Sequence, residues 1–256
     1  MIAITRDVSR SIQLAEITHV QPQRIDYVLA GYQHHQYRRL LESLGCEVVR
    51  LPADDRYPDC VFIEDTAIVL EDLAVITRPG AESRRGETRV VADALEPYRP
   101  LVHIEAPATI DGGDVLVLDD RIYVGLSERT NEAAIGQLRF HTRREVIPVR
   151  IDGCLHLKSG VTRVSRDTLL INRDCVDASA FAGWGFIDVD RAEPFGGNAL
   201  LLGNVVIYPS ELPKTRARLE AHGLDVRAVD QSELAKAEGG VTCCSLLVKT
   251  AADRGR

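Results

Sequence analysis

The chain has 256 residues, of which 45% are hydrophobic, and it carries a formal net charge of −7. An acidic balance argues against nucleic acid as a partner, because nucleic-acid binding needs a positive field. The six cysteines show neither a zinc-knuckle spacing nor a disulfide framework. The first residues lack the layout of a signal peptide, and no apolar run approaches the ~18 residues of a membrane span. We therefore expect a cytoplasmic protein with reduced thiols, a single domain over residues 1–256, and no membrane association.

The first fifty residues predict a strand, a long loop, a helix and a second strand. Residues 2–5 read as a strand, and residues 6–24 are polar and aperiodic. A loop of that length is often a lid over a site. Apolar side chains recur at helical spacing over residues 25–44, and Gly45 is placed to end that helix. Residues 46–51 then predict a strand.

The rest of the chain repeats one plan, in which a polar or glycine-rich entry precedes two short strands, a helix and a further strand. The hairpin strands are predicted at 61–70 and 73–77, 115–118 and 122–124, 161–164 and 168–171, and 199–202 and 205–208. Helices are predicted near 89–95, 130–140, 213–221 and 233–237, and a last strand at 242–248.

The entries of the repeat carry the polar side chains. Taking Asp59, Asp111, His156, Asn198 and Cys243 as markers, the entries lie 52, 45, 42 and 45 residues apart. Periods of this size are typical of solenoids, propellers and rings. A ring of small sheets with helices outside would bring the carboxylates, the imidazole and the thiol to one centre.

Cys243 and His156 are the candidates for covalent chemistry. Cys243 follows a glycine pair, which allows close approach of a ligand, and it stands where a strand is predicted to begin. Strand alternation would then turn the adjacent Cys244 to the opposite face. His156 lies between two leucines. Each could also be a buried core residue, but a Cys–His pair is a standard route to an activated thiolate.

The charged candidates suggest the ligand. Glu64 and Asp65 stand between apolar runs, and burying both without a cation would cost several kcal/mol. A cationic ligand is the natural compensation. Arg84 and Arg129 are either solvated or able to hold a carboxylate through the planar guanidinium. Together these features predict a pocket for a zwitterion with a distant guanidinium group.

Several motifs carry a resemblance to a known family. They are FIED at 62–65, TRPGAESRR at 77–85, DGGDVL at 111–116, LHLK at 155–158 and GVTC at 240–243. In this order, over residues 54–247, the chain resembles dimethylarginine dimethylaminohydrolase of the guanidino-group modifying superfamily. The resemblance implies the pentein fold, a five-bladed α/β propeller with pseudo-five-fold ββαβ repeats around a central active-site channel. This fold agrees with the repeat found from the sequence itself.

The resemblance also implies an activity, the hydrolysis of Nω-methylated L-arginine to L-citrulline. Asymmetric dimethylarginine would release dimethylamine and monomethylarginine would release methylamine, through a covalent thiouronium on a cysteine. The small-molecule substrate would need neither a metal nor an organic cofactor. A homodimer is left open.

The family's roles transfer to this chain residue by residue. Cys243 would be the nucleophile, His156 the general acid and base, and Asp111, where some relatives have glutamate, the support of His156. The substrate would be bound by Glu64 and Asp65 at the guanidinium, Asp59 as an orienting group, Arg84 and Arg129 at the α-carboxylate, the main chain of Ala237 at the α-amino group, and Leu14 as a cap from the early loop. Relatives carry a larger apolar residue at the position of Ala237.

Three other classes compete with this interpretation. Arginine deiminases carry an extra helical domain for which 256 residues leave no room, and amidinotransferases are also longer. A non-catalytic ring, like the ribosome anti-association factors, would not need Cys243, His156 and the Glu64–Asp65 pair together. A papain-like peptidase would show a local signature around its cysteine, and this chain lacks it.

Overall fold

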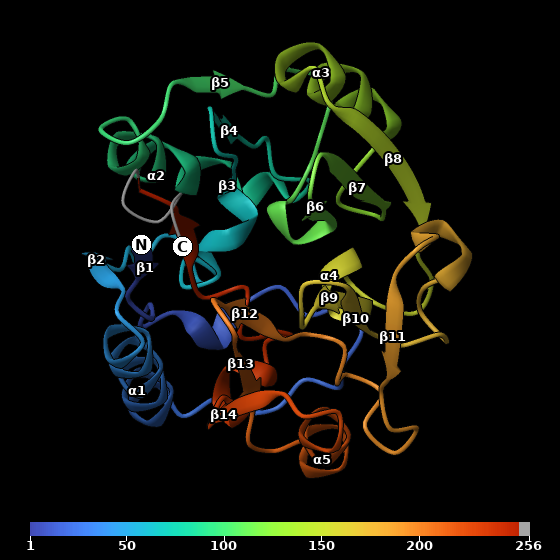
Figure 1. Cartoon of the computed structure of the whole chain (residues 1–256). Helices are drawn as coiled ribbons and strands as arrows, with labels where there is room; N and C mark the ends of the chain where they lie inside the picture. Colours follow the sequence, from blue (N-terminus) through green and yellow to red (C-terminus); the bar gives the residue numbers. More distant parts are fainter. Residues whose placement is uncertain (251–256) are drawn as a thin grey trace.

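Five small sheets form a ring in the computed structural model, which describes residues 1–250 (Figure 1). Each sheet has three strands, of which the central one pairs antiparallel with one neighbour and parallel with the other. In ring order the sheets are β15 (Leu246–Val248), β1 (Ile2–Arg6) and β2 (Glu47–Leu51); β3 (Ala67–Val69), β4 (Ala74–Ile76) and β5 (Leu101–His103); β6 (Val115–Leu118), β7 (Arg121–Leu126) and β8 (Glu145–Arg150); β9 (Val161–Arg163), β10 (Thr168–Ile171) and β11 (Gly185–Asp188); β12 (Leu200–Leu202), β13 (Val205–Pro209) and β14 (Asp225–Val229).

The ring closes by pairing the two ends of the chain. β15 lies antiparallel to β1, with Ile2 opposite Val248 and Ile4 opposite Leu246. The first sheet therefore takes a strand from the last repeat, which is the closure that the repeat pattern predicts. The pentein architecture expected from the sequence is confirmed.

Helices connect the second and third strands of four sheets and lie outside the ring (Figure 1). These helices are α1 (Tyr27–Ser43), α2 (Thr88–Leu95), α3 (Glu132–Thr142) and α5 (Pro213–Ala221). α1 begins at Asp26, whose carboxylate accepts hydrogen bonds from the N–H groups of Val28 and Leu29. It ends at Ser43, and Gly45, two residues later, adopts φ +88°, a conformation that glycine allows at no steric cost. In the third repeat the 3₁₀ turn η5 (Ala178–Phe181) stands in place of a helix.

The hydrophobic core is a chain of five clusters around the ring. Two clusters show the pattern: Ile4 and Leu246 of the first sheet pack with Ala74 and Ile76 of the second, and Leu116 of the third sheet packs with Leu169 and Ile171 of the fourth. Each sheet thus buries apolar side chains against its neighbours in the ring, which is why one repeat alone would not be stable.

Short helical turns stand at the inner ends of the sheets, and one of them, η2 (Ile63–Thr66), replaces the start of the strand predicted over 61–70. η2 and η4 (Gly112–Asp114) precede β3 and β6, and α4 (Leu157–Gly160) precedes β9. η4 contacts both η2 and α4. The last strand begins at Leu246 rather than residue 242, because residues 241–244 form a turn in which the Cys243 N–H donates to Gly240 O at 3.2 Å. The polar entries therefore lie on turns at the centre of the ring.

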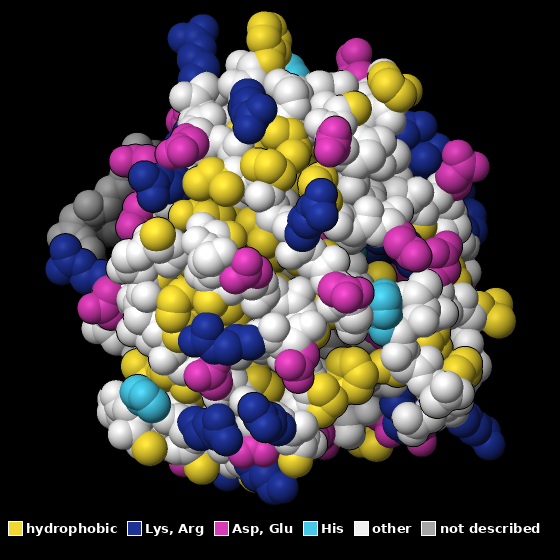
Figure 2. Space-filling model, turned by 90° about the vertical axis from the view of Figure 1, so that its right-hand side faces the viewer, with side chains coloured by type: hydrophobic (Ala, Val, Ile, Leu, Met, Phe, Trp, Pro, Cys, Tyr) yellow, Lys and Arg dark blue, Asp and Glu magenta, His cyan; other side chains and the backbone are white. Residues whose placement is uncertain are grey.

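On the face in Figure 2, acidic and basic side chains are interspersed, and no single sign of charge dominates. Within residues 1–250, no helix combines the length and hydrophobicity needed to cross a bilayer.

Candidate active site

A small pocket lies at the centre of the ring, and its volume of about 20 Å³ is enough for about one water molecule. Its walls come from the early loop and from the entries of several repeats. The lining residues are Glu16, Asp59, Phe62, Asp65, Arg84, Arg129, Leu155, His156, Ala237, Glu238, Gly239 and Cys243. The ring therefore brings the predicted cysteine, histidine and two of the predicted acids to one cavity.

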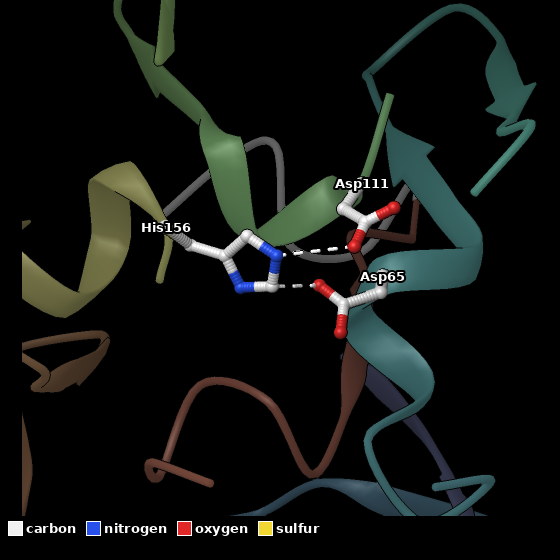
Figure 3. Close-up of side chains that lie close together, drawn as sticks. All are labelled: Asp65, Asp111 and His156. Carbon is white, nitrogen blue, oxygen red and sulfur yellow. Dashed lines mark hydrogen bonds and ion pairs between the residues drawn. The ribbon is translucent and has the colours of Figure 1, made fainter. Parts of the chain in front are cut away.

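His156 is held between two carboxylates (Figure 3). It caps the N-terminus of α4 in an extended conformation, and its Nε2 lies 3.1 Å from Oδ2 of Asp111. Its Nδ1 lies 3.8 Å from Oδ1 of Asp65. Burial alone would lower the pKa of His156, but the charges of Asp65, Asp114 and Asp111 outweigh burial and raise this pKa to about 9. The imidazole is thus protonated at neutral pH and able to donate a proton.

Asp65 is a buried carboxylate with firm hydrogen bonds. Its Oδ2 lies 2.6 Å from Nη1 of Arg84, and its Oδ1 accepts from the Gly113 N–H at 2.9 Å. Burial raises the pKa of Asp65, but His156 and Arg84 lower it to about 2. A Cβ on Gly113 would lie 2.6 Å from His156 Nδ1 and 2.7 Å from Asp65 Oδ1. The second glycine of the DGGD motif therefore leaves the space in which these two side chains meet.

Arg84 lines the pocket but binds mainly to the protein itself. Its guanidinium donates to Asp65, to both carboxylate oxygens of Glu87 at 3.1 and 3.0 Å, and to Phe62 O at 2.9 Å. A buried guanidinium needs hydrogen-bond acceptors and a negative charge beside it, because burying an unpaired charge costs free energy. The geometry makes Arg84 the group that orients Asp65.

Arg129 presents its guanidinium to the pocket, where Nη2 lies 3.1 Å from Oε2 of Glu16. Glu16 also accepts a hydrogen bond from the hydroxyl of Ser83, and its N–H donates to Oδ2 of Asp59 at 3.3 Å. Burial raises the pKa of Asp59 to about 6, although the charge of Arg84 opposes this shift. The early loop thus contributes an acid that occupies the arginine at the pocket wall.

Glu64 lies behind the pocket, not in its wall. Its carboxylate pairs with Lys158 and accepts from the Thr242 hydroxyl at 2.7 Å, while its N–H donates to Cys243 O at 3.1 Å. Asn198 donates to Thr242 Oγ1 at 2.9 Å and to Lys158 O at 3.0 Å. This network joins four repeats beneath the Cys243 turn.

The expectation that Glu64 and Asp65 need a cationic ligand is therefore wrong for these residues. Lys158 compensates the charge of Glu64, while Arg84 and His156 compensate that of Asp65. Lys158 belongs to the LHLK motif, but its ion pair with Glu64 could not be predicted from the sequence, because the two residues lie 94 positions apart.

Cys243 is partly exposed into the pocket, and its Sγ accepts a hydrogen bond from the Gly240 N–H at 3.3 Å. Burial raises the pKa of Cys243 well above its usual value, and the charges of Glu64 and Asp65 raise it further. The sulfur is therefore a thiol at neutral pH. The adjacent Cys244 is buried in the apolar core, so the two cysteines do face different surroundings.

The structure does not bring Leu14 to the pocket. The 3₁₀ turn η1 (Ile12–Leu14) buries Ile12 completely and leaves Leu14 73% exposed. Ala237 does line the pocket, together with Glu238, which the sequence analysis missed along with Glu16. No local signal identifies Glu16, because its place depends on the path of an irregular loop.

Asp65, Asp111 and His156 offer ligand atoms within 4.8 Å of one another, which is close enough for a metal ion. A metal would need the neutral imidazole, whereas the raised pKa keeps His156 protonated at neutral pH. Asp65 is also already paired with Arg84. The donor set therefore fits an imidazolium between carboxylates better than a metal centre.

A ring of five sheets with a thiol, an imidazolium and buried carboxylates at its centre defines a five-bladed α/β propeller of the pentein class. The N-terminal domain of ArgZ, a cyanobacterial arginine dihydrolase, has the same fold, with a TM-score of 0.86 at 18% identity over 97% of this chain and 98% of that domain. The family described as N,N dimethylarginine dimethylhydrolase, eukaryotic, matches residues 20–248. The chain belongs to the dimethylarginine dimethylaminohydrolase family.

Two bacterial relatives show the same relationship. The N(G),N(G)-dimethylarginine dimethylaminohydrolase of Pseudomonas aeruginosa is 36% identical over 226 residues, which cover 86% of this chain and 89% of the relative. The protein of the same name from Streptomyces coelicolor is 36% identical over 96% of both chains. A cysteine-to-serine variant of the Pseudomonas protein, complexed with citrulline, has a TM-score of 0.91 at 34% identity over 95% of this chain and 97% of that chain.

Proposed function

We propose that this chain hydrolyses Nω-methylated L-arginine to L-citrulline and dimethylamine or methylamine. The observation that carries the proposal is the shared pocket of the Cys243 thiol, the His156 imidazolium and the Asp65 carboxylate. The citrulline complex of the Pseudomonas relative supports it. So does a dimethylarginine dimethylaminohydrolase histidine-to-glycine variant solved as an adduct with S-methyl-L-thiocitrulline, at a TM-score of 0.90 and 35% identity.

The reaction begins with ionisation of Cys243. A guanidinium bound beside the sulfur favours the thiolate, because its positive charge opposes the effects of burial and of the neighbouring acids. The thiol loses its proton to solvent, and the thiolate attacks the guanidinium carbon. His156 then donates a proton to the departing methylamine or dimethylamine as the carbon–nitrogen bond breaks. A thiouronium remains on Cys243.

Hydrolysis of the thiouronium uses the same groups in reverse. The neutral His156 removes a proton from a water molecule, which attacks the carbon. The carbon–sulfur bond breaks, citrulline leaves, and the sulfur takes up a proton again. Asp111 keeps His156 in place through both steps, because its carboxylate is hydrogen-bonded to Nε2.

The remaining pocket groups bind the substrate. Asp65 holds the guanidinium, and Asp59, from the same repeat entry, orients it. Arg129 takes the α-carboxylate with support from Arg84, and the main chain at Ala237 meets the α-amino group. Glu64 acts from behind the pocket by fixing the Cys243 turn through its N–H and its bond to Thr242.

The test compares Cys243→Ser with Cys244→Ser. Citrulline release is measured with asymmetric dimethylarginine, monomethylarginine and arginine, and binding is measured by calorimetry. Cys243→Ser should bind the methylated substrates and release no citrulline, whereas Cys244→Ser should retain turnover, because Cys244 lies in the core. Citrulline release by Cys243→Ser would contradict the proposed nucleophile. Ammonia release from arginine that exceeds amine release from both methylarginines would favour the deiminase alternative.

A further inference from the structure

Two cysteines outside the pocket lie side by side behind His156. Cys154 stands two residues before His156, and Cys175 lies in the loop between β10 and β11, at the outer right of the ring in Figure 1. Ile151 forms an antiparallel bridge with Val176, and the Asp152 N–H donates to Cys175 O at 3.0 Å. These bonds hold the two cysteine-bearing segments together.

Gly160 gives both cysteine side chains a common surface. A Cβ on Gly160 would lie 3.0 Å from Cβ of Cys175 and 3.7 Å from Sγ of Cys154. Both side chains therefore lie against the same small residue. The backbone bonds and the shared contact with Gly160 hold the two cysteine side chains near one another, and such proximity is the first condition for a disulfide.

The two thiols differ in reactivity. The neighbouring Cys154 lowers the pKa of Cys175, while the neighbouring Cys175 and burial raise the pKa of Cys154. Cys175 is also the more accessible of the two, since Cys154 is buried and Cys175 is partly exposed. An accessible cysteine with a lowered pKa beside a second thiol is the arrangement found in redox-sensing pairs.

We propose that Cys154 and Cys175 are a redox site that hydrogen peroxide converts to an intramolecular disulfide. The Cys175 thiolate attacks one peroxide oxygen, the O–O bond breaks, and the released hydroxide takes a proton to become water. Cys175 is then a sulfenic acid. The Cys154 sulfur attacks the sulfenic sulfur, the S–O bond breaks, and the leaving hydroxide takes the Cys154 proton as a second water. Two thiols lose two electrons, and the peroxide gains them.

The disulfide would act on the pocket through residues 154–156. Cys154 Sγ donates to His156 O at 3.4 Å, and this donor is lost when the thiol is oxidised. Leu155 and His156 both line the pocket. We expect the disulfide to lower turnover reversibly, a consequence that rests on the proposed function, whereas formation of the disulfide does not.

Mass spectrometry tests the disulfide directly. Trypsin separates the two cysteines, because residues 151–158 carry Cys154 alone and residues 174–191 carry Cys175 alone. The protein is treated with hydrogen peroxide, alkylated and digested, with and without dithiothreitol. The expected product is a disulfide-linked pair of these two peptides that dithiothreitol removes. The peptide 237–249 carries Cys243 and Cys244 and should remain alkylated. A loss of its alkylation would report oxidation of the proposed nucleophile.

Two single variants test the order of the steps. In Cys154→Ser, Cys175 should accumulate as a sulfenic acid that dimedone traps. In Cys175→Ser, Cys154 should stay unlabelled by dimedone. Absence of the linked peptides in the wild-type protein, or labelling of Cys154 in Cys175→Ser, would overturn the proposal.

Citrulline assays of the same samples test the coupling to the pocket. Wild-type turnover should fall as the linked peptides appear and recover with dithiothreitol, whereas turnover of Cys175→Ser should not respond. A complete disulfide with unchanged turnover would overturn the coupling and leave the disulfide established. A Cys175→Ser protein that is inactive before any oxidation would contradict the expectation that Cys175 affects turnover only through the disulfide.

Discussion

Glu16 of the early loop forms an ion pair with Arg129 inside the pocket, at 3.1 Å between Oε2 and Nη2. Arg129 is the residue to which we assign the α-carboxylate of the substrate. The carboxylate of Glu16 therefore occupies the proposed position of the substrate carboxylate. Binding would require Glu16 to release Arg129.

Glu16→Gln should lower KM for methylated arginine by about 1.4-fold to fivefold, because a partly exposed ion pair contributes about 0.2–1 kcal/mol. The change removes the competing charge and leaves Arg129 in place. Steady-state kinetics measure the effect. The control is Glu82→Gln, since Glu82 is exposed and pairs with Arg85. A KM that rises instead would mean that Glu16 contacts the substrate.

Asp111→Asn should lower kcat, by up to ~100-fold, because the imidazolium of His156 loses a charged partner at 3.1 Å. The upper pKa in the pH profile of kcat should also shift to lower pH, since Asp111 contributes to the raised pKa of His156. Asp119→Asn is the matched control, as Asp119 sits on the exposed β6–β7 turn. An unchanged pH profile in Asp111→Asn would contradict the proposed coupling.

The stability of the fold should depend on the charge of His156. The pKa of His156 is about 9 in the folded protein and near 6.5 for a free histidine, so the folded state binds the proton more tightly. This contribution, on the order of 3 kcal/mol, is complete below pH 6.5 and is lost as the pH rises through 9. Denaturant unfolding at several pH values measures it. His156→Gln should remove this part of the pH dependence, and an identical dependence in both proteins would refute the shift.

Lys158→Met should destabilise the protein by about 3–5 kcal/mol, because Glu64 would remain buried without its cation. Adding Glu64→Gln should restore much of this loss, since an uncharged amide still accepts from Thr242. Denaturant unfolding compares the single and double variants. Arg121→Met removes an exposed ion pair with Glu145 and should cost less than about 1 kcal/mol. Additive losses in the double variant would argue against the Glu64–Lys158 pair.

Glu238 holds the early loop, since its carboxylate accepts from the N–H groups of Thr18 and Val20 at 3.1 and 2.9 Å and also from that of His19. Glu238→Ala should make trypsin cleave after Arg24 roughly tenfold faster, which corresponds to the loss of about 1.4 kcal/mol of loop stability. Timed proteolysis measures the rate. Glu220→Gln, an exposed change on α5, is the control. Equal cleavage rates in Glu238→Ala and the wild type would show that other contacts hold the loop.

The sequence alone determined the repeat, because each unit depends on local hydrophobic spacing and turn residues. The helix over 25–44 is found at Tyr27–Ser43, and the hairpins around residues 71, 119 and 203 are found as the β3–β4, β6–β7 and β12–β13 pairs. The markers Asp59, His156 and Cys243 do line one pocket, as a ring of five units requires. The motifs that carried the family resemblance are equally local.

Only the tertiary structure decided how the charges are paired. Lys158 neutralises Glu64 across 94 positions, and Glu16 rather than Leu14 enters the pocket. The turns that replace the predicted strand starts, and the raised pKa values of His156 and Cys243, also arise at the centre of the closed ring. Electrostatic interactions depend on distance and burial, and neither is defined until all five repeats meet.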